Sequence, residues 1–280
     1  MPSFTPSPWR LLRDQPLAGP ENMARDRALL DVMEEQLAAG ESPAPILRFY
    51  DWSPPTLSFG RGQKIEQAAD LEACRREGVD LVRRPTGGRG VLHDQELTFG
   101  VIAPATGPLA GTGVSRAAAA LAAALADGLC RLGVPAAIAR GLPGLAHRER
   151  RGACFGSTSR EELTVDGRKL CGAAQFRGRG ALLEHGSLPF VFDVERQARV
   201  LGADPGVLTT KAMGLADCLT RVPDRDEVEA ALSAGFETEL AARLEPSELT
   251  ERETEVTLQR AAALREDTAS WRPAAQPCAS

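Results

Sequence analysis

The chain has 280 residues, 43% of them hydrophobic, and carries a formal net charge of −5. A chain of this length and composition can build a sizeable core, as one large domain or two small ones. Its acidic balance excludes nucleic acid as the main partner, because binding to phosphates needs a concentrated basic face.

No targeting or anchoring segment is predicted. Residues 1–8 lack the charged start and the apolar stretch of a signal peptide, and no run of about 18 consecutive apolar residues follows. The six cysteines are dispersed without CxxC pairing, which indicates neither a zinc site nor a disulfide framework. We therefore expect a cytoplasmic protein with reduced thiols, no membrane partner, no metal and no cofactor. The sequence leaves the oligomeric state open and favours a monomer.

Signals of helices and strands alternate along the chain. Apolar residues at helical spacing predict helices over residues 22–39, 66–78, 115–132 and 226–240. Short apolar or alternating runs predict strands over residues 46–50, 56–59, 79–83 and 96–102. From residue 194 onward helices should dominate.

Residues 83–94, with the sequence RRPTGGRGVLHD, form the most informative stretch. Its glycines allow close approach of the backbone to a ligand, and the neighbouring arginines, His93 and Asp94 supply charge. A plain turn would need a glycine or two but gives no reason for these charged neighbours, so we interpret the stretch as a ligand-binding loop. No GxxxxGK(S/T) pattern is present, and a Walker-type nucleotide site is not supported.

A second segment, residues 163–188, combines small residues with Lys169 and His185. Asp166-Gly167 predicts a tight hairpin turn, because these residues readily adopt positive φ values. In a regular strand after that turn, Lys169 and Cys171 share one face, together with Ala173. A lysine beside a turn is also expected to have little packing around it. For His185 a structural and a functional role stay equally open.

Together these residues resemble the lipoate–protein ligase A and octanoyltransferase family of the biotin/lipoate ligase superfamily. Its members carry an RRxTGGGxVxHD-like loop followed by a GxKLxGxAQxR and HGSL hairpin. The resemblance is weaker at residues 22–26, 52–63 and 208–215, and it covers most of residues 20–245. One departure is Arg89, where many relatives have a third glycine.

The resemblance implies an α/β (α+β) catalytic domain of the biotin/lipoate ligase type, with a mixed β-sheet flanked by helices. We expect this domain over residues 20–245. Residues 1–19 are expected to be a mobile N-terminal segment, and residues 246–280 a small helical C-terminal extension with a mobile tail.

The resemblance also implies the site. Lys169 would be catalytic, because its ammonium can polarise an acyl carbonyl and stabilise the developing oxyanion. His93 would help proton transfer, and the arginines and glycines of the loop would shape the site. The expected substrate-binding residues are Arg83, Arg84, Thr86, Gly87, Gly88, His93, Gly172, Ala173, His185 and Gly186.

Cys154 matches the place of the nucleophilic cysteine in the octanoyltransferase branch. It follows a basic stretch that includes Arg148, Arg150 and Arg151, and positive surroundings lower a thiol pKa and raise its thiolate fraction. Cys171 is the main rival, and a buried inert cysteine is the plain alternative. We predict that Cys154 takes an octanoyl group from octanoyl-acyl carrier protein and passes it to a lysine of a lipoyl-domain acceptor protein.

Two other functions stay open at this point. An ATP-dependent lipoate–protein ligase would use the same loop and Lys169 to bind a lipoyl-adenylate, and would need no cysteine. A non-catalytic binder of lipoyl domains or acyl carrier proteins would need neither Lys169 nor Cys154. The presence of Cys154 favours the acyltransferase of lipoate biosynthesis.

Overall fold

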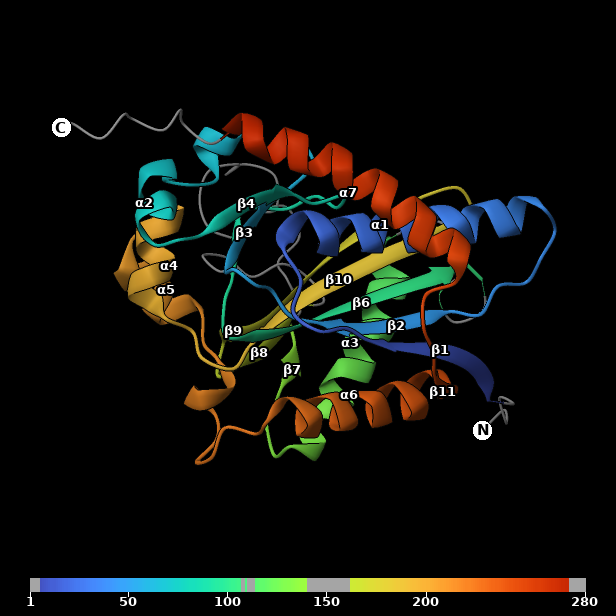
Figure 1. Ribbon diagram of the computed structural model, residues 1–280. Helices are drawn as coiled ribbons and strands as arrows, with labels where there is room; N and C mark the ends of the chain where they lie inside the picture. Colours follow the sequence, from blue (N-terminus) through green and yellow to red (C-terminus); the bar gives the residue numbers. More distant parts are fainter. Residues whose placement is uncertain (1–5, 107–108, 110–113, 140–161, 272–280) are drawn as a thin grey trace.

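The structure, a computed structural model, describes residues 6–106, 109, 114–139 and 162–271. A mixed eight-stranded sheet has helices on both faces (Figure 1). Helices α1 (Gly19–Ala38) and α7 (Glu251–Trp271) cover one face, and α3 (Val114–Arg131) and α6 (Arg225–Leu240) cover the other. The predicted mixed sheet flanked by helices is confirmed.

The strand order of the large sheet is β11-β1-β2-β6-β10-β9-β8-β7. β11, β1 and β2 run parallel, and every other neighbouring pair is antiparallel. The strands span β1 (Ser7–Arg13), β2 (Ile46–Tyr50), β6 (Glu96–Pro104), β7 (Ala137–Ile138), β8 (Leu163–Val165), β9 (Arg168–Arg177), β10 (Ala181–Pro189) and β11 (Ala242–Pro246).

A second sheet of three strands carries the glycine-rich loop. Its order is β4-β3-β5, and residues 84–90 join β4 to β5. The strands are β3 (Thr56–Phe59), β4 (Asp80–Arg83) and β5 (Val91–His93), and a second core packs them against α2 (Leu71–Arg76), α4 (Val194–Leu201) and α5 (Pro205–Lys211). In Figure 1 this part lies at the left of the large sheet. No helix in the described ranges is long and apolar enough to cross a membrane.

Several predicted boundaries need correction. Residues 7–13, expected in a mobile segment, form β1, because Trp9 and Leu11 bury their side chains in the main core. The helix expected over residues 66–78 is interrupted: Asp70 caps α2 by accepting a hydrogen bond from the Ala73 amide, after a short 3₁₀ turn. Trp271, expected in the tail, is the last residue of α7.

The two faces of the large sheet differ in polarity. On the face toward α3 and α6, the alternate residues Leu97, Phe99 and Val101 of β6 belong to the main apolar core. The other face is apolar near Ile102 but polar toward the start of β6. The buried polar side chains at that end are Arg48, Glu96, Thr98, His185 and Ser187. They lie beside the glycine-rich loop, and the candidate site is built on them.

Candidate functional site

Arg84 holds the glycine-rich loop from inside. Its guanidinium donates to the carbonyl oxygens of Ser58 (3.0 Å), Gly87 (2.8 Å) and Arg89 (2.7 Å), and only 4% of the residue is exposed. A planar guanidinium with five fixed donors suits such a set of converging carbonyls. Arg84, predicted to bind substrate, therefore shapes the backbone of the loop.

Two glycines let the loop lie against β3. A side chain at Gly60 would place its Cβ 2.2 Å from the Gly88 carbonyl oxygen, so the two backbones are in contact. Gly88 also has a φ of +95°, which favours glycine. At Gly87, in contrast, no atom of the described residues lies within 4 Å of the position that a Cβ would take. Gly87 thus presents open backbone on the loop, as a substrate-binding residue requires.

Arg83, the neighbour of Arg84, points elsewhere. Its Nη1 donates to the Gln63 carbonyl oxygen (2.9 Å), and its guanidinium lies 4.5 Å from the ring centre of Phe59 and 5.4 Å from that of Trp271. These contacts connect β4 to the end of α7 through a cation–π arrangement. Arg83 is only half-buried, so a contact with a charged substrate group stays a prediction.

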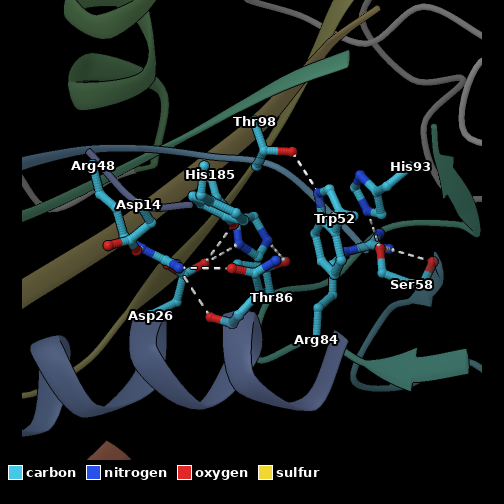
Figure 2. A network of polar contacts seen from close by, with 12 residues as sticks. Asp14, Asp26, Arg48, Trp52, Ser58, Arg84, Thr86, His93, Thr98 and His185 are labelled. Atoms are coloured by element: carbon cyan, nitrogen blue, oxygen red, sulfur yellow. Dashed lines mark hydrogen bonds and ion pairs between the residues drawn. The ribbon is translucent and has the colours of Figure 1, made fainter. Parts of the chain in front are cut away.

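His93 connects the two sheets. Its Nδ1 lies 2.7 Å from Glu96 Oε1 of β6, and its Nε2 lies 2.7 Å from Ser58 Oγ of β3. The Trp52 ring stacks on His93 at 4.1 Å between ring centres, and Trp52 Nε1 donates to Thr98 Oγ1 (2.7 Å; Figure 2). Both ring nitrogens of His93 are thus engaged in holding the site together. Asp94, the next residue, bonds instead to Arg196 of α4.

Ser58, His93 and Glu96 are linked as hydroxyl, imidazole and carboxylate, the order in which a serine nucleophile is activated. Ser58, however, has 0% of its surface exposed, and its Oγ also accepts a hydrogen bond from Arg84 Nη1 (3.1 Å). A nucleophile must form a covalent bond with the substrate, which a fully covered hydroxyl held by both His93 and Arg84 cannot do. We therefore infer that these three linked side chains hold β3, β5 and the loop in position.

His185 connects the loop to α1. Its Nε2 lies 2.7 Å from Thr86 Oγ1, and its Nδ1 lies 3.0 Å from Asp26 Oδ2 (Figure 2). Asp26 in turn accepts hydrogen bonds from Arg48 Nη1 (2.6 Å) and from the Tyr50 hydroxyl (2.8 Å). Thr86 and His185, both predicted site residues, are thus brought together.

Burial and charge set the protonation of this group. Burial is the main cause that lowers the pKa of His185 below its ordinary value. For Asp26, burial alone would raise the pKa, but Arg48 and His185 outweigh it and the pKa lies below the ordinary carboxyl range. Burial and the Asp26 charge raise the pKa of Tyr50. Near neutral pH we therefore expect a neutral imidazole beside an ionised carboxylate.

Lys169 is fully buried, which corrects the expectation of a loosely packed lysine. Its Nζ lies 2.5 Å from Glu162 Oε1, and neither side chain exceeds 7% exposure. The predicted turn is confirmed, with φ of +50° at Asp166 and +77° at Gly167. The ordered lysine beside this turn holds its charge in one place, as electrostatic stabilisation of a reacting group requires.

A bulge in β9 decides which side chains accompany Lys169. Thr164 pairs with Lys169 but Leu163 pairs with Cys171, so Leu170 is an extra residue in β9. The bulge places Lys169 and Cys171 on opposite faces, so the prediction that they share one face is wrong. Cys171 belongs to the main apolar core, and burial raises the pKa of its thiol, which leaves it poorly suited as a nucleophile.

Gly172 makes room for Lys169. A Cβ at Gly172 would lie 2.6 Å from Cε and 2.8 Å from Nζ of Lys169. Gly172 pairs with Ser187 on β10. The Lys169 ammonium therefore lies on the face of the sheet that carries Ser187 and the other buried polar side chains. Gly172 therefore acts in the site through the position of Lys169.

We predict that Gly172→Ala slows catalysis more than it destabilises the fold. The added methyl group must displace the buried ammonium, and misplacing a catalytic group by about 1 Å can cost about 10²-fold in rate. Steady-state kinetics together with melting curves would measure both effects. Gly62→Ala is the matched control, because no residue in the described part of the chain has an atom within 4 Å of its new Cβ. Equal rates for the two variants would contradict the role of Gly172.

Two predicted residues have other surroundings. Ala173 is exposed and pairs with Gly186, on the opposite face of β9 from Gly172. At Gly186 a Cβ would lie 2.4 Å from Phe99 Cζ, so this glycine allows the close packing of the apolar core. Ala173 and Gly186 thus lie on the face of the sheet opposite the buried polar side chains. A contact between their backbones and the substrate stays a prediction.

Cys154 and the basic stretch before it lie outside the described residues. Among the described cysteines, burial raises the pKa of Cys74 to about 12 and also raises the pKa of Cys218. Cys130 is exposed on α3. Cys171 has its raised pKa in the apolar core. Burial therefore disfavours the thiolate at three of these four cysteines.

A cavity of about 920 Å³ lies between α1, α7 and the turn that joins β9 to β10. Burial of apolar surface is what would stabilise a bound alkyl chain. Seven of the thirteen residues that line this cavity have charged side chains, among them Arg27, Asp31, Glu34, Arg179, Arg252 and Arg260. We do not assign it to an acyl chain.

The structure adds site residues that sequence reasoning missed. Asp26, Arg48, Glu96 and Glu162 are all buried and bonded to predicted site residues or to their partners. One signal was available: Arg48 interrupts the apolar strand ILRFY, where a charge is unexpected. Glu162 gave no such signal, because it is one of many acidic residues in the chain.

Comparisons with known proteins agree with this architecture. A family model described as the lipoyl protein ligase A/B catalytic domain matches residues 19–237. The octanoyltransferase LipM of Moorella thermoacetica is 39% identical over 262 residues, which cover 90% of this chain and 93% of the relative. The octanoyltransferase LipM of Geobacillus kaustophilus is 38% identical, with 88% and 91% covered.

Solved structures show the same fold. A crystal structure of lipoate-protein ligase A bound with ATP superposes with a TM-score of 0.76 at 23% identity, over 91% of this chain and 95% of that one. A bi-partite lipoate protein ligase of Thermoplasma acidophilum, described together with its E2 lipoyl domain, gives a TM-score of 0.72 at 22% identity, over 92% and 93%.

Proposed function

Because this chain belongs to the lipoyl protein ligase A/B catalytic domain family, we propose that it is an octanoyltransferase of lipoate biosynthesis. The observation that supports transfer best is the similarity to octanoyltransferases over about nine tenths of both chains. The site suits acyl transfer, because a buried lysine ammonium lies at the polar end of the sheet. Such a charge can stabilise the oxyanion that forms when a thioester or amide bond is exchanged.

The proposed reaction has two steps. The Cys154 thiolate attacks the carbonyl carbon of the octanoyl thioester of acyl carrier protein, and the carrier leaves as its thiolate, which takes up a proton. The unprotonated amine of an acceptor lysine on a lipoyl domain then attacks the enzyme thioester. An amide forms, and the Cys154 sulfur leaves and receives the proton that the amine loses. The reduced thiol that this requires is favoured in the cytoplasm.

The described residues have distinct roles in this proposal. Lys169, held by Glu162 and given space by Gly172, stabilises the oxyanion in both steps. Gly87 offers open backbone to the substrate, while Arg84 keeps the loop in shape. The acid–base role first considered for His93 fits less well, because both of its nitrogens are engaged with Ser58 and Glu96.

The choice of donor tests the proposal. We predict that octanoyl-acyl carrier protein modifies a lipoyl-domain lysine without ATP, and that ATP does not raise the rate. Free octanoate or lipoate with ATP should be a poor donor, because this mechanism activates the acyl group as a thioester. Intact-mass measurement of the lipoyl domain would follow the reaction. Attachment of free lipoate with ATP at a comparable rate would identify a ligase, and no attachment from any donor would identify a non-catalytic binder.

A further inference from the structure

Asp26 lies at the centre of a buried group that extends from α1 to the glycine-rich loop. Gly100 of β6 pairs with Arg48 on one neighbouring strand and with His185 on the other. Residues that pair directly across strands point to the same side of a sheet, here toward α1. Gly100 has no side chain between them, and a Cβ there would lie 3.3 Å from Asp26 Oδ1. The Asp26 carboxylate occupies this space.

The ionised Asp26 carboxylate needs a hydrogen-bond donor from each polar neighbour. Asp26 is 0% exposed and accepts hydrogen bonds from Arg48 (2.6 Å) and Tyr50 (2.8 Å), while His185 Nδ1 lies 3.0 Å away. An ionised carboxylate can only accept hydrogen bonds, so the proton of the neutral His185 ring must be on Nδ1. This leaves a lone pair on His185 Nε2.

The tautomer of His185 fixes the direction of the next hydrogen bond. Nε2 lies 2.7 Å from Thr86 Oγ1, and with a lone pair on Nε2 the Thr86 hydroxyl must donate. Thr86 is 0% exposed and directly precedes Gly87, which presents open backbone. The Thr86 carbonyl oxygen also accepts a hydrogen bond from the Arg61 amide (2.8 Å). Both the side chain and the carbonyl group of Thr86 are therefore held in place, directly before Gly87 and Gly88.

We propose that Asp26 is a positioning residue for acyl transfer, which holds His185 in its Nδ1–H tautomer and thereby fixes Thr86 and the backbone of Gly87. This inference rests on the proposed octanoyltransferase function. Stability alone gives a weak reason for the arrangement, because a buried ion pair often adds little compared with apolar side chains of the same volume. The group ends at the glycine-rich loop (Figure 2). A fixed hydrogen-bond direction there would hold Thr86, and with it the backbone of Gly87, in one position.

The first test is spectroscopic and does not depend on activity. The chain has three histidines, so long-range proton–nitrogen spectra of labelled protein can be assigned with His185→Gln. We expect His185 to show the Nδ1–H pattern in the wild type. Asp26→Asn should shift it toward Nε2–H, because an amide nitrogen can donate to Nδ1. A wild-type His185 in the Nε2–H or the doubly protonated form would overturn the proposal.

The second test is kinetic. Asp26→Asn and Thr86→Val should each lower kcat by about 10- to 100-fold, the size of loss seen in metal sites when a partner that orients a ligating histidine is removed. The KM for octanoyl-acyl carrier protein should stay near the wild-type value. Thr86→Ser keeps the hydroxyl and should retain most of the rate. The double variant should lose no more than one single variant, because both changes break the same chain of contacts.

Glu253→Gln is the matched control. This change neutralises a buried carboxylate that lies 2.5 Å from the Arg10 guanidinium. Glu253 belongs to α7 and not to the group around Asp26. We expect a lower melting temperature with unchanged kcat, whereas Asp26→Asn should lower both. Losses that multiply in the double variant, or an Asp26→Asn enzyme that folds with full kcat, would overturn the inference. If Asp26→Asn does not fold, the Thr86 variants and the wild-type spectrum decide.

The outcomes also separate this inference from the function on which it rests. A wild type without transfer from octanoyl-acyl carrier protein would overturn the proposed function and this inference together. An active wild type whose Thr86→Val variant keeps the full rate would overturn only the inference.

Discussion

Cys154→Ala should abolish octanoyl transfer while the protein stays folded. Without its thiolate the enzyme cannot form the thioester intermediate, and an enzyme that loses its nucleophile loses a factor on the order of 10⁶ in kcat. The measurement is transfer of octanoyl from acyl carrier protein to a lipoyl domain, followed by mass, at protein concentrations that reveal very slow turnover. Melting curves should show that the variant unfolds close to the wild-type temperature.

Two further cysteine variants make this test specific. Cys130→Ala removes an exposed thiol from α3 and should leave the rate unchanged. Cys171→Ala creates a small space in the apolar core, and should lower stability more than rate. Full activity of Cys154→Ala, or loss of activity on replacement of Cys171 at unchanged stability, would remove Cys154 from the mechanism.

Lys169→Met should lower the rate of transfer by about 10²- to 10³-fold, the usual effect of losing one donor to an oxyanion. It should also destabilise the fold, because the buried ion pair with Glu162 is lost. Breaking a buried ion pair typically costs about 3–5 kcal/mol. The sequence predicted loose packing beside the turn and hence no loss of stability; the burial of Lys169 contradicts the loose packing, and the loss of stability is the result that we now expect.

The double variant Lys169→Met/Glu162→Gln separates the two effects. Removal of both charges should restore part of the melting temperature, because both members of the buried ion pair are neutralised together. The rate should stay as low as in Lys169→Met, since the ammonium is still missing. A double variant that transfers octanoyl at the wild-type rate would show that Lys169 acts only in folding.

The sequence predicted those elements whose structure depends on residues that are neighbours in the chain. The strands at residues 46–50 and 56–59 were predicted residue for residue, because the first is mostly apolar, the second alternates polar and apolar residues, and a proline precedes each. The Asp166-Gly167 turn was predicted from the preference of these residues for positive φ.

The site depends on contacts that local patterns do not contain. His185 and Asp26 are 159 residues apart in the chain, and His185 and Thr86 are 99 apart. The bulge at Leu170 depends on how β8 and β9 pair, so the faces of Lys169 and Cys171 could not be read from alternation alone. Only the family resemblance, and neither composition nor periodicity, predicted that Lys169 and the loop belong to one site.

The most direct test of the central claim is to incubate the wild-type protein with octanoyl-acyl carrier protein in the absence of ATP, and then to measure its intact mass and map its peptides. We expect the added mass of one octanoyl group per chain, located on Cys154 and discharged when a lipoyl domain is added. No added mass on the enzyme while the lipoyl domain becomes octanoylated, or an adduct on Cys171, would contradict this claim.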